Sequence, residues 1–137
     1  MKKFETKKDL QREELAINFF CNQFNLTYQK LDEFDIDYNI FKDGKHIANV
    51  EVKGRLKTIA EAYPLPIAVR KILKLSDSHS NPIIIWSCDD GIIFAKLKSL
   101  VGRIKYGGRV VRDGATNDME IMAYYNKQEC LKEIKFN

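Results

Sequence analysis

The chain has 137 residues, of which 45% are hydrophobic and 31% are charged, so it is long enough and apolar enough to bury a substantial core. This composition excludes a disordered chain, a fibrous repeat and an enzyme with a separate cofactor domain. Lys and Arg outnumber Asp and Glu by 23 to 19, and the resulting net charge of +4 is compatible with a phosphate-rich partner without requiring one.

The first third of the chain predicts one helix and a group of strands. Apolar residues recur at helical spacing over Lys7–Phe24, and Asn25 can end that helix. The pattern becomes extended over residues 27–55, with Lys42-Asp43-Gly44 as a hairpin turn between two strands.

The rest of the chain predicts shorter elements. Two prolines precede a short amphipathic helix at 67–75, and a continuous apolar run predicts a strand buried on both faces at 83–86. The remaining predictions are a strand at 92–95, a loop at 102–118, a last strand at 119–125 and a closing helix at 128–134. This order predicts a three-layer α/β sandwich with a mixed central β-sheet, as a single domain over residues 1–137.

The cysteines and the apolar runs indicate an intracellular protein. Cys21, Cys88 and Cys130 form no C-x-x-C pair, so neither a disulfide framework nor a zinc site is predicted, and we interpret them as small buried residues. The N-terminus lacks the apolar run of a signal peptide, and the longest apolar run is far too short to span a membrane. We therefore expect a cytoplasmic protein with no membrane partner.

The residues that point to chemistry lie on either side of the predicted hairpin. Glu51 and Lys53 are two residues apart, so in a strand they share one face, while Val50 and Val52 take the other face and can enter the core. An acid and a lysine side by side also occur commonly on solvated strands, so this pair needs support from its neighbours.

The hairpin supplies that support if its register is favourable. A three-residue loop with Gly44 in a G1 bulge would place Asp35 opposite Glu51 and Asp37 opposite Asn49, all on the face of Glu51. A two-residue Asp-Gly turn would shift the pairing by one residue and move Asp37 to the other face. The sequence leaves this register open.

Several carboxylates on adjacent strands repel one another unless a cation neutralises them. A divalent cation with oxygen ligands fulfils that need, and it can activate water and stabilise the charge that develops on a phosphodiester. A nearby lysine can assist as a charge stabiliser or a general acid–base group. The spacing therefore predicts metal-dependent hydrolysis of a phosphodiester.

These residues carry a resemblance to a known superfamily. Asp37, a hairpin and then Glu51-Val52-Lys53 resemble the PD-(D/E)XK nucleases, although no proline precedes the acid, and the predicted element order resembles their αβββαβ restriction-endonuclease-like core over roughly residues 7–100. The resemblance implies that Asp37 and Glu51 bind Mg²⁺ or Mn²⁺ and that Lys53 orients the attacking water. Asp35 is the alternative ligand to Asp37, and the shorter spacing to Glu51 favours Asp37.

Two further residues fit the same resemblance. Many members carry an acid on the first helix, and Glu13 lies at the middle of the apolar stripe of the predicted helix, although it could also lie at the stripe's edge as a solvated residue. Members often carry Lys or Gln on the helix after the triplet, and Lys71 is the candidate here, with Lys74 close to it. A purely solvating role for these lysines is the alternative.

The glycine-rich stretch 105–120 is similar to a segment of small phage-type members of the superfamily that resemble Holliday junction resolvases. Its glycines let backbone amides and basic side chains approach phosphates, and Tyr106 could stack on a base. We expect nucleic-acid contacts from four basic residues here, Arg103, Lys105, Arg109 and Arg112. A flexible loop with scattered charges is the alternative, and Asp118 and Glu120 are candidate partners of these arginines.

The sequence as a whole predicts a Mg²⁺- or Mn²⁺-dependent deoxyribonuclease with a role in DNA repair or recombination. A homodimer is a reasonable expectation for so small a chain. If a phage encodes the protein, we expect it in the host cytoplasm. The catalytic set is Asp37, Glu51, Lys53, Glu13 and Lys71. The competing hypothesis is a catalytically inactive nuclease fold that binds nucleic acid, and a third is a protein-interaction module with no affinity for DNA.

Overall fold

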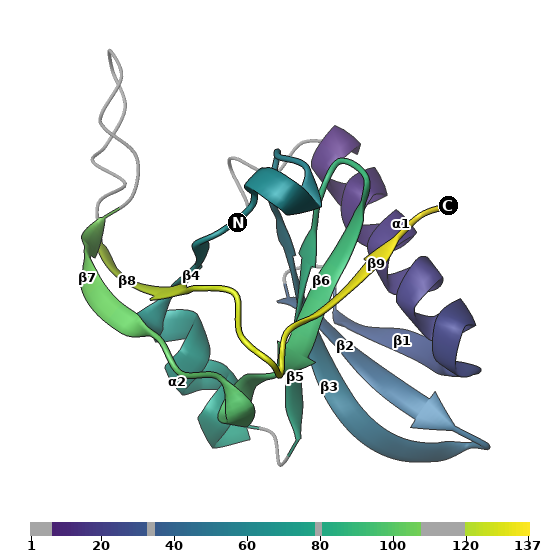
Figure 1. Ribbon diagram of the computed structural model, residues 1–137. Coiled ribbons are helices and arrows are strands. Elements are labelled where there is room, and N and C mark those ends of the chain that lie inside the picture. Colours follow the sequence, from purple (N-terminus) through teal and green to yellow (C-terminus); the bar gives the residue numbers. More distant parts are fainter. Residues whose placement is uncertain (1–6, 33–34, 79–80, 108–119) are drawn as a thin grey trace.

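A computed structural model (Figure 1) describes residues 7–32, 35–78, 81–107 and 120–137, and within these ranges it leaves the side chains of 32, 35–37 and 78 undescribed. The described part contains two α-helices, nine strands and two short 3₁₀ helices. In chain order these are α1 (Lys7–Phe24), β1 (Thr27–Asp32), β2 (Asp35–Lys42), β3 (Lys45–Gly54), η1 (Ile59–Glu61), β4 (Leu65–Ala68), α2 (Val69–Ser78), β5 (Pro82–Ser87), β6 (Gly91–Lys96), η2 (Leu97–Ser99), β7 (Arg103–Gly107), β8 (Glu120–Tyr125) and β9 (Lys132–Lys135).

The strands form two sheets. The larger sheet has six strands in the order β1-β2-β3-β5-β6-β9, in which β3 and β5 are parallel and the other neighbours are antiparallel. The smaller sheet has the order β4-β8-β7 and is antiparallel. The predicted α/β class with a mixed central sheet is confirmed.

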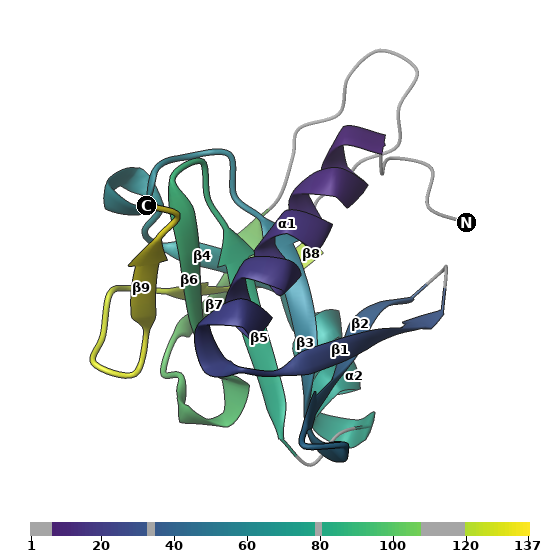
Figure 2. The same cartoon turned by 90° about the vertical axis from the view of Figure 1, so that its right-hand side faces the viewer.

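Helix α1 lies across one face of the large sheet (Figure 2). Its predicted bounds are confirmed, and it ends at Asn25, whose φ of 54° is left-handed. The amide of Leu26 donates to the carbonyl of Cys21 at 2.9 Å, which completes a Schellman cap. The buried stripe of α1 packs against alternate residues of the strands beneath it, in a core that includes Ala16, Ile17, Phe20, Tyr38, Ile40, Ala48, Val50, Val52, Ile85 and Ile92.

A second core fills the other face of the large sheet, between that sheet, α2 and the small sheet. It includes Ile84 and Trp86 of β5, which alternate with the residues that face α1. Trp86 is fully buried, and its Nε1 donates to the carbonyl of Pro66 at 2.9 Å, which ties β4 to the large sheet. The central strand β5 therefore contributes to an apolar core on each face of the sheet.

Three predictions about elements were wrong or displaced. Residues 128–134 were predicted as a helix, but Lys132–Lys135 form β9 because they pair with the open edge of β6. Arg103–Gly107 form β7 rather than loop because they pair with β8, and residues 108–118 of that predicted loop lie outside the described residues. The helix predicted at 67–75 begins at Val69, since Ile67 and Ala68 pair with β8 as part of β4.

Neither described helix is both long enough and apolar enough to cross a lipid bilayer.

Gly91 tests the position of β9, because a Cβ added there would collide with the backbone of Ile134 and Lys135. We expect Gly91→Ala to lower the free energy of unfolding by about 2 kcal/mol, as overpacking against backbone does. Gly54→Ala is the matched control, since no heavy atom lies within 4 Å of its Cβ position, and it should change stability by less than about 0.5 kcal/mol. Urea unfolding measures both. Equal effects would contradict the packing of β9 on β6.

The cysteines differ in accessibility, which predicts their order of reaction. Cys21 and Cys88 are buried, and burial raises the pKa of Cys21 to about 11 and that of Cys88 to about 12, whereas Cys130 is only half-buried. Fewer thiolates form at the two buried residues at pH 8. We expect a single fast phase with a thiol reagent at pH 8 that Cys130→Ala removes. A fast phase that survives this substitution would contradict the burial of the other two thiols.

Candidate active site

The turn that joins β2 and β3 has two residues. Asp43 and Gly44 have φ values of 52° and 79°, and Lys42 pairs with Lys45 across them. The prediction of a three-residue loop that pairs Phe41 with Lys45 was therefore wrong. Two successive positive φ values are typical of a type I′ turn, which matches the twist of the strands that it joins.

A β-bulge then changes the register. Phe41 pairs with His46 but Ile40 pairs with Ala48, so β3 contributes one extra residue between these pairs. Beyond the bulge Asp37 pairs with Glu51, whereas Asp35 pairs with Asp32 of β1. The predicted pairings of Asp35 with Glu51 and of Asp37 with Asn49 are corrected, because the shorter turn shifts the register by one residue and the bulge shifts it by one more in the same direction. The total shift of two residues keeps Asp37 on the face of Glu51.

The corrected register places Asp37 and Glu51 at directly opposite positions, which share one face of an antiparallel pair. The next pair along that face is in contact, since Nδ2 of Asn49 donates to Oδ1 of Asn39 at 2.6 Å. The prediction that a two-residue turn moves Asp37 to the face opposite Glu51 was wrong, because the bulge shifts the register by a further residue.

Glu51 lies on the face of β3 that turns toward α2. Its carboxylate side chain is 1% exposed, and its neighbours Val50 and Val52 are fully buried in the core under α1. Lys53, two residues further along the same face, is half-buried. The predicted separation of the polar and apolar faces of β3 is thus observed.

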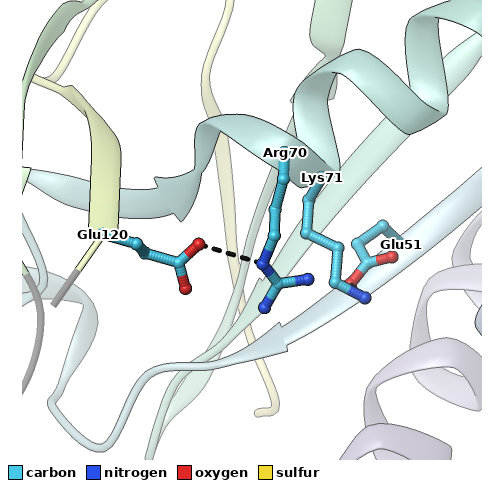
Figure 3. Close-up of polar contacts among 4 residues, drawn as sticks. All are labelled: Glu51, Arg70, Lys71 and Glu120. Atoms are coloured by element: carbon cyan, nitrogen blue, oxygen red, sulfur yellow. Dashed lines mark hydrogen bonds and ion pairs between the residues drawn. The ribbon is translucent and has the colours of Figure 1, made fainter. Parts of the chain in front are cut away.

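Lys71 reaches this carboxylate from α2. Its Nζ lies 3.9 Å from Oε2 of Glu51, and its side chain is 18% exposed, so the ammonium group is largely buried beside the acid (Figure 3). A cation so close compensates part of the free energy that burial of a carboxylate costs. Lys74, the second candidate on this helix, is exposed.

Glu13 occupies a different layer. It is buried on the stripe of α1 that also carries Ala16 and Ile17, as the apolar pattern predicted. That stripe packs on the face of β3 formed by Val50 and Val52, whereas Glu51 lies on the opposite face. Lys71 thus contacts Glu51 and Lys53 shares its strand face, whereas Glu13 is carried by the helix that covers the opposite face of β3.

Part of the predicted basic surface lies on the small sheet. Arg103 and Lys105 are exposed on β7, and Nζ of Lys105 lies 5.1 Å from the centre of the Tyr124 ring, while Arg109 and Arg112 lie outside the described residues. Glu120, a predicted partner of the arginines of this stretch, contacts Arg70 of α2.

The Arg70–Glu120 contact was missed by sequence reasoning. Nε of Arg70 lies 2.9 Å from Oε1 of Glu120, although the two residues are 50 positions apart in the chain (Figure 3). Only the pairing of β8 with β4, which leads directly into α2, brings the two residues together. The sequence carries no local signal for such a contact.

Comparison with protein families identifies this chain. The model of a family described as "Phage putative PDDEXK endonuclease" matches residues 1–132, which is nearly the whole sequence. The chain belongs to this family. The resemblance to phage members of the PD-(D/E)XK nuclease superfamily is therefore confirmed. Comparisons with curated proteins and with solved structures give no match.

The donor set of this PD-(D/E)XK family member fits a hard divalent cation in part. Carboxylate oxygens are the ligands that Mg²⁺ prefers, and Glu51 supplies two at a position directly across from Asp37. Among the side chains that the structure describes, no three acidic, histidine or cysteine residues form a ready-made metal cluster. The side chain of Asp37 lies outside that set.

The contact between Lys71 and Glu51 predicts a coupled effect on stability. Lys71→Met removes the cation beside a buried carboxylate, so we expect the free energy of unfolding to fall by about 1–2 kcal/mol. Combining it with Glu51→Gln should recover at least half of that loss, because the charge that needed compensation is gone. Urea unfolding of the single and double variants measures the coupling. Strictly additive losses would show that the two side chains do not interact.

Proposed function

We propose that the protein is a divalent-metal-dependent deoxyribonuclease that hydrolyses phosphodiester bonds with water as the nucleophile. The observation that carries the proposal is the buried carboxylate of Glu51, which has Asp37 at the opposite register position and a lysine on each of two elements nearby. Membership of an endonuclease family supports the same conclusion. We assign α1, β1 to β3, α2 and β5 to the αβββαβ core of one nuclease domain.

Asp37 and Glu51 would hold Mg²⁺ or Mn²⁺. Such a cation, when bound, lowers the pKa of water and stabilises negative charge on the reacting phosphate. Burial of Glu51 keeps one ligand fixed in a site of low dielectric, where charge interactions are strong. Lys71 offsets the charge of Glu51 and thereby lowers the cost of keeping a carboxylate there.

Lys53 is the residue assigned to proton and water positioning. It lies on the same face as Glu51, two residues along the strand, and it is half-buried, which places it beside that carboxylate on the strand. Lys53 would orient the attacking water and stabilise the developing charge. Glu13 is assigned a supporting role through α1, and the activity of Glu13→Gln tests it.

DNA is the proposed substrate, and basic side chains outside the acidic site would bind its backbone. Arg103 and Lys105 are exposed on β7, and Arg109 and Arg112 follow in the sequence. Such contacts would make the affinity for DNA fall as the salt concentration rises, because phosphate binding releases counterions. A homodimer would enlarge the surface available to grip a duplex, and a role in repair or recombination would suit such an enzyme.

Cleavage of plasmid, linear and branched DNA with Mn²⁺ tests the function. We expect activity that EDTA removes, and we expect Glu51→Ala and Lys53→Ala to lower it by at least about 100-fold. The variants should retain the fold and most of the affinity for DNA. Absence of cleavage, together with DNA binding that EDTA does not alter, would instead support the nuclease-fold binding protein.

The register provides a matched pair of acids for a second test. Asp37 lies opposite Glu51, while Asp35, two residues earlier in the same strand, pairs with β1. We expect Asp37→Asn to abolish cleavage and to weaken Mn²⁺ binding measured by calorimetry, and Asp35→Asn to leave both within about threefold. The reverse result would assign the ligand to Asp35 and contradict the reading of the hairpin.

A further inference from the structure

Arg70 and Lys71 are neighbouring cations at the start of α2, but they differ in their surroundings. Lys71 is largely buried against Glu51, whereas the side chain of Arg70 is 66% exposed. A large polyanion can reach an exposed guanidinium without displacing the protein around it. Of these two cations, Arg70 is therefore the one open to substrate.

Glu120 restricts the orientation of Arg70. The carboxylate contacts Nε at 2.9 Å, and Figure 3 shows Nε facing Glu120 while the two terminal nitrogens point away from it, one of them on the side of Lys71. An arginine carries five N–H donors, of which four are on the two terminal nitrogens. A contact through Nε leaves the terminal fork to present a flat pair of donors, the geometry that matches two oxygens of a phosphate.

Stability does not explain this contact. Glu120 is 37% exposed and Arg70 more so, and ion pairs with this much exposure contribute little to folding because water and salt screen them. Glu120 also adds negative charge beside a surface that would bind a polyanion, which is unfavourable for binding unless the residue has another role. Holding the guanidinium in one orientation is such a role.

We propose that Arg70 binds a backbone phosphate of the nucleic acid beside Glu51 through its terminal nitrogens, and that Glu120 is the positioning residue that holds it. The inference rests on the proposed nuclease function for its effect on cleavage, but it makes a separate statement about phosphate binding. Arg70 is the substrate-binding group, and Glu120 acts only through it.

Affinity for a labelled DNA duplex in EDTA tests the role of Arg70 without cleavage. Arg70→Ala should weaken binding by about three- to tenfold and lower the slope of log affinity against log salt by about 1, since one phosphate contact is lost. Arg70→Lys keeps the charge but lacks the pair of terminal nitrogens, so its affinity should lie between those of the wild-type protein and Arg70→Ala. Lys127→Ala is the control, since it removes a cation that is 71% exposed in an ion pair with Glu133, and it should have a smaller effect.

A double-mutant cycle tests the role of Glu120. Glu120→Gln keeps an acceptor for Nε and should retain most of the affinity and of the cleavage rate with Mn²⁺, whereas Glu120→Ala should lose part of both. In the Arg70→Ala background Glu120→Ala should no longer weaken binding, because the favourable effect of Glu120 acts only through Arg70. Loss of its negative charge should then leave the affinity unchanged or slightly higher. If Glu120 served only as a repulsive charge, both of its variants would bind DNA more tightly, and the proposal would be overturned.

The two proposals can fail separately. If the wild-type protein cuts DNA and Arg70→Ala matches it in affinity and rate, the inference about Arg70 is wrong and the nuclease function stands. If the wild-type protein does not cut with any divalent metal but Arg70→Ala binds DNA more weakly with the reduced salt slope, the nuclease function is wrong and Arg70 remains a phosphate-binding residue.

Discussion

The carboxylate of Glu51 is buried in the middle of the large sheet, on the face of β3 opposite the apolar core under α1, and much of the architecture around it follows from that constraint. A carboxylate held away from water is costly unless a cation and polar groups compensate it. Lys71 supplies a cation at 3.9 Å, and this requires α2 to lie close to β3. The acidic site and the position of the second helix are thus energetically linked.

The position of α2 depends in turn on the small sheet. β4 leads directly into α2, pairs with β8 and is tied to the large sheet by the hydrogen bond from Trp86 to Pro66. Trp86 and Ile84 lie on the same face of β5 and fill the space beneath α2 and the small sheet. The same arrangement carries Glu120 at the start of β8 to Arg70 at the start of α2. One packing arrangement therefore places both Lys71 and Arg70.

The hairpin shows how little the position of a site residue depends on the turn alone. The shorter turn by itself would have moved Asp37 to the other face of the sheet from Glu51. The bulge between the pairs Phe41–His46 and Ile40–Ala48 adds one residue to β3 and thereby brings the two acids to opposite positions on one face. Because side chains alternate with a period of two, a single inserted residue decides which face each acid takes.

The sequence by itself determined the features that depend on short-range residue patterns. The stripe of α1, its end at Asn25, the burial of Glu13 and the separation of Val50 and Val52 from Glu51 and Lys53 follow from periods of 3.6 and two residues. Only the tertiary structure decided the bulge, the strands β4, β7 and β9, and the contacts Lys71–Glu51 and Arg70–Glu120. Each of these depends on partners brought together by strand pairing or packing, and segments such as Lys132–Lys135 become strands because an open sheet edge satisfies their backbone hydrogen bonds. Local pattern carries no information about such distant partners.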